Sequence, residues 1–134
     1  MGNMANYYPE YFNGIILDVP YFDVLTDFSN SDDYFYLGSI ENPDEFNNLK
    51  KIDPYQNIKP QDYPNLLFFG ALQDINVEPS SYIKAVAKLR QTKTDNNVLL
   101  LRVLMNSGHG VDLGKIQQKQ ALIYSFMLNC LPKE

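Results

Sequence analysis

Three short apolar runs divide the chain and predict three buried strands. They occupy residues 14–19, 66–72 and 98–104. The runs are nearly continuous in apolar side chains, whereas a half-exposed strand alternates apolar with polar residues. We therefore expect the strands of a parallel sheet that is covered on both faces.

Two longer stretches place apolar residues at helical spacing. Residues 79–90 predict a helix whose first turn accommodates Pro79. The apolar face of this helix comprises Tyr82, Ile83, Val86, Ala87 and Leu89. Residues 115–130 predict a final helix. Its apolar side comprises Ile116, Ile123, Met127 and Leu131.

The stretch between the first two apolar runs is long and polar. Residues 22–63 are rich in Asp, Asn, Ser and Pro, with aromatic residues between them, which predicts an excursion with short helices, one near residues 43–51. Another helix is expected at residues 1–8, before Pro9. Strands that alternate with helices indicate a single α/β domain over residues 1–134, with three parallel strands and flanking helices.

Two side chains with catalytic potential follow strands. Asp74 comes just after the second apolar run, and His109, the only histidine, follows the third. Because the carboxyl ends of parallel strands share one edge of a sheet, we expect these two side chains to meet. A carboxylate fixes the tautomer of a histidine base and stabilises the imidazolium, so Asp74 is the predicted acid and His109 the predicted base. Gly108 and Gly110 are expected to let the histidine loop turn sharply.

Simpler interpretations exist for these residues. A lone histidine is usually an ordinary surface or core residue, and a lone aspartate after a strand is usually a turn or cap residue. No serine of the chain lies between small residues in a strand-to-helix elbow, and Ser107 belongs to the same loop as His109. Cys130 is interpreted as a small buried apolar residue. On these residues alone, the ordinary interpretation of His109 is the stronger one.

A series of short motifs in a fixed order covers nearly the whole chain. The motifs are Val19-Pro20-Tyr21-Phe22-Asp23-Val24-Leu25-Thr26, Asp53-Pro54-Tyr55-Gln56-Asn57-Ile58, Tyr63-Pro64, Leu72-Gln73-Asp74, Val86-Ala87-Lys88-Leu89-Arg90, Lys93-Thr94-Asp95 and Ser107-Gly108-His109-Gly110. Together they resemble the end of the prolyl oligopeptidase family of serine peptidases, and most of all its oligopeptidase B branch. The order of the motifs carries the resemblance, because each motif is short.

The resemblance implies both a fold and a site. It implies a partial α/β-hydrolase fold with the chain order nucleophile, acid, base, in which Asp74 is the acid and His109 the base. The nucleophilic serine of the family lies in a Gly-x-Ser-Ala-Gly-Gly elbow, which these 134 residues do not contain. By this comparison, Met1 is expected to lie a few residues past that serine.

Three motifs depart from the pattern of the family. The family has Asp-x-Arg-Val after the catalytic acid, with the arginine placed to contact substrate, whereas this chain has Asn76 there. Pro79-Ser80 replaces an aromatic pair. Oligopeptidase B holds the arginine and lysine side chains of its substrates with a Glu-x-Glu pair. Here only Asp33 keeps an acid, so Asp33 is the expected substrate-binding residue.

Composition narrows the possible partners. The chain carries 11 Lys and Arg against 16 Asp and Glu, with a net charge of −5 and no cationic cluster along the sequence, which argues against nucleic acid. No apolar run approaches about 18 residues, and the N-terminus lacks the pattern of a signal peptide, so no membrane association is expected. One histidine and one cysteine do not make a metal site or a disulfide. We therefore expect no cofactor, and a cytoplasmic location, where a single thiol stays reduced.

Two functions fit these observations. In the first, the chain carries the acid and the base of an oligopeptidase B-like serine peptidase and hydrolyses peptides only with a companion chain that supplies the serine. In the second, it is a repurposed, non-catalytic interaction module. Asp74 and His109 favour the first function, whereas Asn76 favours the second. Association with a companion peptidase fragment or a second copy is expected, because the first strand lacks the neighbour that it has in the family.

Overall fold

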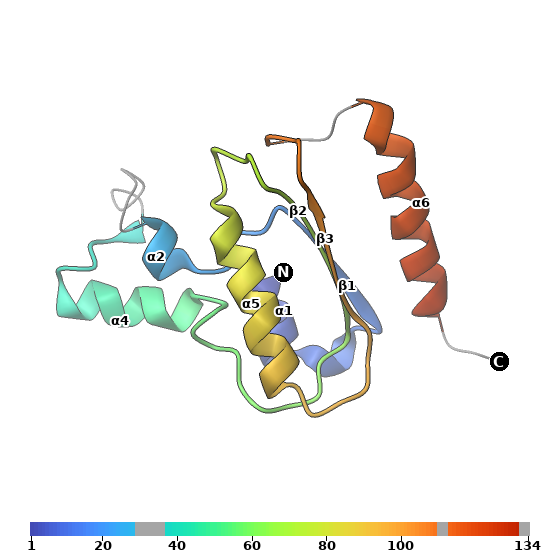
Figure 1. Ribbon diagram of the computed structural model, residues 1–134. Helices are drawn as coiled ribbons and strands as arrows, with labels where there is room; N and C mark the ends of the chain where they lie inside the picture. The colour runs from blue at the N-terminus through green and yellow to red at the C-terminus, as the bar shows by residue number, and fades with distance from the viewer. Residues whose placement is uncertain (29–36, 110–112, 132–134) are drawn as a thin grey trace.

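Three parallel strands form the centre of the structure, in the order β1-β2-β3 (Figure 1). The computed structural model describes residues 1–28, 37–109 and 113–131. Along the chain the elements are α1 (Gly2–Tyr7), η1 (Pro9–Tyr11), β1 (Gly14–Asp18), α2 (Val24–Phe28), α4 (Pro43–Ile52), β2 (Asn65–Ala71), α5 (Pro79–Thr92), β3 (Leu99–Leu104) and α6 (Leu113–Asn129). The predicted strands, the flanking helices and the α/β class are confirmed.

The sheet is covered on both of its faces. Neighbouring residues of β2 belong to different apolar clusters, with Phe68 in the cluster on one face and Phe69 in the cluster on the other. This explains why the strands are continuous apolar runs in the sequence. The last residues of β2 and β3, Ala71 and Leu104, are paired in the register, so the two strands end side by side.

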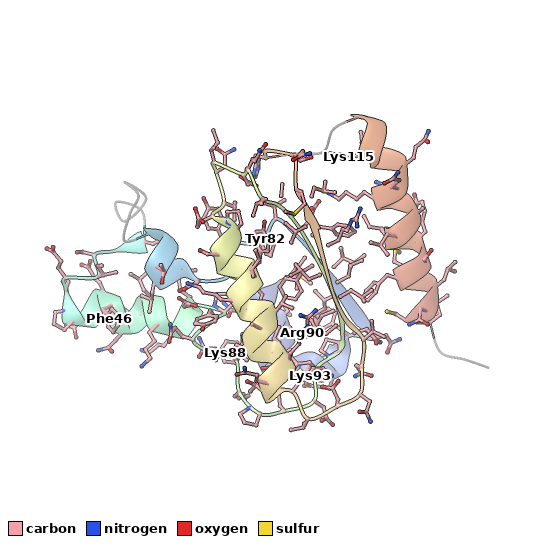
Figure 2. The ribbon with its side chains drawn as sticks, viewed as in Figure 1. Phe46, Tyr82, Lys88, Arg90, Lys93 and Lys115 are labelled. Carbon is pink, nitrogen blue, oxygen red and sulfur yellow. The ribbon has the colours of Figure 1, made fainter. Side chains whose placement is uncertain are left out.

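Helices α1 and α5 cover one face of the sheet (Figure 1). Tyr82 of α5 points to the sheet and is fully buried, and its hydroxyl donates to the carbonyl of Ala71 at 3.0 Å (Figure 2). Gly70 permits this close approach, because a Cβ at position 70 would lie 2.1 Å from the Tyr82 ring. Ile83 and Ala87, both on the predicted apolar face, are exposed. The buried apolar residues of α5 beyond Pro79 are Tyr82, Ala85, Val86 and Leu89.

Helix α6 lies on the opposite face of the sheet (Figure 1). It packs on the sheet through Leu122, Ile123 and Phe126, together with Cys130, which directly follows the helix. This corrects the predicted apolar side, of which only Ile123 faces the sheet. Ile116, Met127 and Leu131 are 38%, 50% and 59% exposed. No helix in the described part of the chain, α6 included, has the length and apolar character needed to cross a membrane.

Two buried carboxylates attach the polar excursion to the rest of the fold. Asp53, which follows α4, accepts the backbone N–H of Leu25 at 2.9 Å. Asp23 accepts the N–H of Thr26 at 3.3 Å and forms an ion pair with Lys84 of α5. The two carboxylates therefore satisfy N–H groups in the first turn of α2, which has no intrahelical partners for them. Helices α2 and α4 extend beyond α5 to one side of the sheet (Figure 1).

Candidate active site

Asp74 and His109 meet at the edge where β2 and β3 end. Nδ1 of His109 lies 2.9 Å from Oδ2 and 3.1 Å from Oδ1 of Asp74. The residues are 35 positions apart and belong to separate loops, so the parallel register of the two strands brings them together. The predicted proximity is confirmed. With the ring proton on Nδ1, His109 donates to the carboxylate and keeps Nε2 as its basic nitrogen.

The carboxylate of Asp74 is held by its own loop as well as by His109. Its side chain is fully buried, and Oδ1 accepts the backbone N–H groups of Asn76 at 2.9 Å and Val77 at 3.0 Å. Burial by itself raises the pKa of this carboxyl. The hydrogen bonds from Val77, Asn76 and His109 outweigh that effect, so the pKa of Asp74 lies below its usual value. Asp74 is therefore ionised at neutral pH, as the acid that orients a histidine must be.

The loop that carries His109 is fastened to the loop that carries Asp74. The backbone N–H of Gln73 donates to the carbonyl of Ser107 at 3.1 Å. On its other side, Ser107 Oγ accepts a hydrogen bond from Lys115 Nζ at 3.2 Å. Ser107 is buried, whereas the side chain of His109 is 45% exposed. The loop that positions the imidazole is thus held by hydrogen bonds at Ser107, while the ring itself remains accessible to solvent, as a general base requires.

Gly108 does not have the conformational role that the sequence predicts. Its φ lies outside the left-handed region that favours glycine. A Cβ at position 108 would lie 3.4 Å from the carbonyl oxygen of Gln73, which is an ordinary contact. Gly110, the second glycine of this prediction, lies outside the described residues. The approach to His109 therefore does not depend on glycine at position 108.

A cavity of about 370 Å³ opens beside His109. Its wall includes Asp18 and Val19 at the end of β1, and Lys119 of α6. Lys119 forms an ion pair with Asp18 at 2.5 Å. Val19 has a φ of 46°, which a β-branched residue rarely adopts, and its N–H donates to the carbonyl of Phe69 at 2.9 Å. A cavity at the carboxyl ends of parallel strands is the usual ligand position in an open α/β sheet.

Comparison with known proteins decides the family. Residues 1–134, the whole chain, match the model of the prolyl oligopeptidase family. The chain belongs to the prolyl oligopeptidase family. Protease 2 of Moraxella lacunata is 30% identical over 142 residues, which cover 100% of this chain and 21% of the relative. Dipeptidyl aminopeptidase BI of Pseudoxanthomonas mexicana is 29% identical, with 98% of this chain and 19% of the relative covered.

Solved structures of the prolyl oligopeptidase family share this fold. Oligopeptidase B from Leishmania major superimposes with a TM-score of 0.92 at 29% identity, over 97% of this chain and 19% of that protein. A thermophilic esterase from Thermogutta terrifontis, at 18% identity and a TM-score of 0.61, shares the fold alone. The predicted α/β-hydrolase fold is confirmed. The chain spans about a fifth of the length of the curated relatives that it matches first.

Two further positions were singled out by comparison with the prolyl oligopeptidase pattern, Asp33 and Asn76. Asp33, the expected substrate-binding residue, lies outside the described residues. Asn76, which stands where an arginine is expected, is exposed. Its carbonyl accepts the hydroxyl of Tyr21 at 2.6 Å, so the backbone of the acid loop is also fastened to the segment after β1.

The sequence patterns did not single out Asp18 or Lys119. Their ion pair joins residues 101 positions apart, so no local sequence pattern predicts it. The only sequence signal is a lysine in a final helix that contains no acidic residue. Within the described ranges, no three His, Cys, Asp or Glu side chains are grouped in a way that would hold a metal ion.

Proposed function

We propose that Asp74 and His109 are the acid and the base of a serine peptidase of the oligopeptidase B type. The observation that carries the proposal is the 2.9 Å contact between the His109 ring and a buried carboxylate, in a chain of this family. The nucleophilic serine comes from polypeptide outside these 134 residues, which contain no Gly-x-Ser-x-Gly pentapeptide. On their own, the 134 residues do not hydrolyse peptides.

The proposed reaction uses the accessible nitrogen of His109. Nε2 removes the proton of the serine hydroxyl while the serine oxygen attacks the carbonyl carbon of the scissile bond, and Asp74 stabilises the resulting imidazolium. His109 then gives that proton to the departing amine, which leaves an acyl-enzyme ester. In the second half, His109 takes a proton from the water that hydrolyses this ester. The N–H donors that stabilise the oxyanion come with the serine elbow.

The proposed substrates are peptides with a basic residue at the cleaved position. Asp33 is the one acid that remains of the pair in oligopeptidase B, and a single carboxylate holds the guanidinium or ammonium group of such a residue less strongly than a pair does. Asn76 removes a cationic contact to substrate. This loss favours the alternative function, a non-catalytic interaction module that has kept the fold of the peptidase.

The proposed partner is a companion polypeptide that adds a strand beside β1. In the described part of the chain, β1 pairs with β2 only, so its other edge carries unpaired backbone groups. Asp18 and Val19 at the end of β1 line the cavity beside His109. A strand added at this edge would therefore end next to the imidazole, where a nucleophile is needed.

A chimera tests the proposal. Residues 1–134 replace the matching stretch of Protease 2 from Moraxella lacunata, and hydrolysis of arginyl and lysyl amides is measured. We expect turnover that falls about 10⁴-fold in Asp74→Asn, because the histidine loses its orienting carboxylate, and further in His109→Ala. Asn47→Ala, on the exposed surface of α4, is the matched control and should leave kcat/KM unchanged.

Two outcomes would contradict the proposal. A folded chimera without turnover would argue against catalysis and favour the interaction module. Turnover by the 134 residues alone, abolished in Ser107→Ala, would show that the nucleophile lies within this chain.

A further inference from the structure

A second cavity, of about 160 Å³, lies between β3 and α6. Its polar lining consists of Arg102 from β3 and Lys115, Gln118 and Lys119 from α6. The described residues that line it include no carboxylate. The chain as a whole has a net charge of −5, so this concentration of positive charge runs against its composition. No cationic cluster is visible in the sequence, because the fold brings the arginine of a strand to the lysines of a helix.

Of the three cations that line this cavity, Arg102 is the one without a partner among the described residues. It lies on the α6 side of β3, since its neighbours Leu101 and Val103 pack against the cluster on the α5 side. Its register partner is Phe69, whose ring also lies 5.3 Å from Lys119 Nζ. Among the described residues, the Arg102 guanidinium forms neither a hydrogen bond nor an ion pair. It is exposed, so an anion from solution can reach it.

The two lysines of the cavity also contact the candidate active site. Lys115 Nζ lies 3.2 Å from Ser107 Oγ, and Ser107 in turn accepts the N–H of Gln73, the residue before Asp74. Figure 2 shows Lys115 at the end of α6 nearest to this loop. Lys119 is paired with Asp18 on the wall of the cavity beside His109. A ligand that attracts these lysines therefore acts on the support of the imidazole.

We propose that this cavity binds a small polyvalent oxyanion of the phosphate or sulfate type, and that Lys115 and Ser107 transmit its binding to His109. Arg102 supplies the planar fork that holds two oxygens of such an anion, while Lys115 and Lys119 supply compact positive charges. Because Lys119 is already paired with Asp18, Arg102 and Lys115 supply the two positive charges that a divalent oxyanion matches better than a monovalent carboxylate does. The proposal goes beyond peptide hydrolysis and does not depend on it.

Titration of the 134-residue chain with inorganic phosphate tests the site. Calorimetry measures binding at fixed pH and at an ionic strength held constant with sodium chloride, and NMR follows the ring signals of His109, the only histidine. We expect saturable binding and a shift of the His109 signals. Arg102→Gln should weaken binding by at least about tenfold, because it removes a charge-assisted pair of hydrogen bonds. Lys50→Gln, at an exposed position of α4, changes the net charge equally and should leave the affinity unchanged.

Further variants separate the site from its coupling to His109. Lys115→Gln should suppress the imidazole shift at saturating phosphate, and Arg102→Lys should bind with intermediate affinity because it keeps the charge without the fork. Circular dichroism checks that each variant is folded. Binding that sodium chloride alone reproduces, or unchanged affinity in both Arg102 variants, would overturn the site. Saturable binding without any imidazole shift would overturn the coupling.

Discussion

Asp74 combines full burial of its side chain with a negative charge, and three donors make this combination stable. The backbone N–H groups of Asn76 and Val77 reach one carboxylate oxygen, and the ring of His109 reaches both. The folded state therefore prefers the ionised carboxyl, which is why the pKa of Asp74 is lowered in spite of burial. The same preference links the stability of the protein to pH.

Asp74→Asn tests this link. The folded-state pKa of Asp74 lies below the unfolded value, so its contribution to stability is complete above the usual aspartate pKa and is lost as the pH falls through the folded-state pKa. We expect the variant to lower the free energy of unfolding by about 1 kcal/mol at about pH 7, and the difference to shrink as the pH falls below about 4. Urea denaturation across this range measures it. Glu10→Gln, at an exposed carboxyl, is the control. A cost for Asp74→Asn that does not change with pH would show that the charge is not its source.

At the scale of single residues, the sequence predicted those site residues whose position follows from a local pattern. Asp74 and His109 were predictable because each lies in the loop that follows an apolar run, and strands of a parallel sheet end at a common edge. Asp18, Arg102 and Lys119 were not predictable. Their surroundings consist of elements that are distant in sequence, and a charged residue in an apolar stretch does not say which element will face it.

At the scale of elements, β2 and α5 approach each other very closely at Gly70. Among the described glycines, Gly70 is the one whose added Cβ would lie nearest to another side chain, the Tyr82 ring. We expect Gly70→Ala to lower the free energy of unfolding by about 3 kcal/mol, since its Cβ would overlap the Tyr82 ring and displace the hydroxyl from the carbonyl of Ala71. Gly108→Ala should cost less than about 1 kcal/mol, because its Cβ meets only an ordinary contact. Thermal and chemical denaturation of both variants measures the contrast. Equal effects would mean that the β2–α5 packing is looser than the structure indicates.

For helix α6, the sequence predicted the element but not the side of the helix that packs on the sheet. Its existence follows from spacing, but its apolar residues surround most of its circumference, so spacing alone did not identify the side that packs on the sheet. The structure selects the side with Phe126 and leaves Tyr124 and Leu128 61% and 69% exposed. The side that packs is determined by the sheet, because Leu67 and Phe69 of β2 form the apolar surface that Phe126 contacts.

At the scale of the whole molecule, one edge of β1 has no strand partner among the described residues, and this edge determines how the isolated chain behaves. We expect the 134 residues to associate at micromolar concentration, because an unpaired strand edge beside exposed apolar side chains favours strand addition. Light scattering after size exclusion, over a range of concentrations, gives the mass.

Leu128→Lys on α6 separates the two possible causes of association. The substitution changes an exposed apolar residue of the helix and leaves the strand edge intact. Association should therefore persist in this variant. Its loss would place the contact on α6, and a monomer that melts cooperatively would show that the β1 edge is protected.

The two connections between the strands differ in what they contain. Residues 72–98 connect β2 to β3 and include Asp74, whereas residues 19–64 connect β1 to β2 and include the excursion with α2 and α4. The excursion is anchored at its base by Asp23 and Asp53, and doubling the length of a loop costs only about 0.6 kcal/mol in closure entropy. Insertions between residues 37 and 42, which precede α4 and are not buried, are therefore cheap for the fold and leave Asp74 and His109 undisturbed. Such a division lets evolution, or a protein engineer, vary one connection freely while the other stays constant.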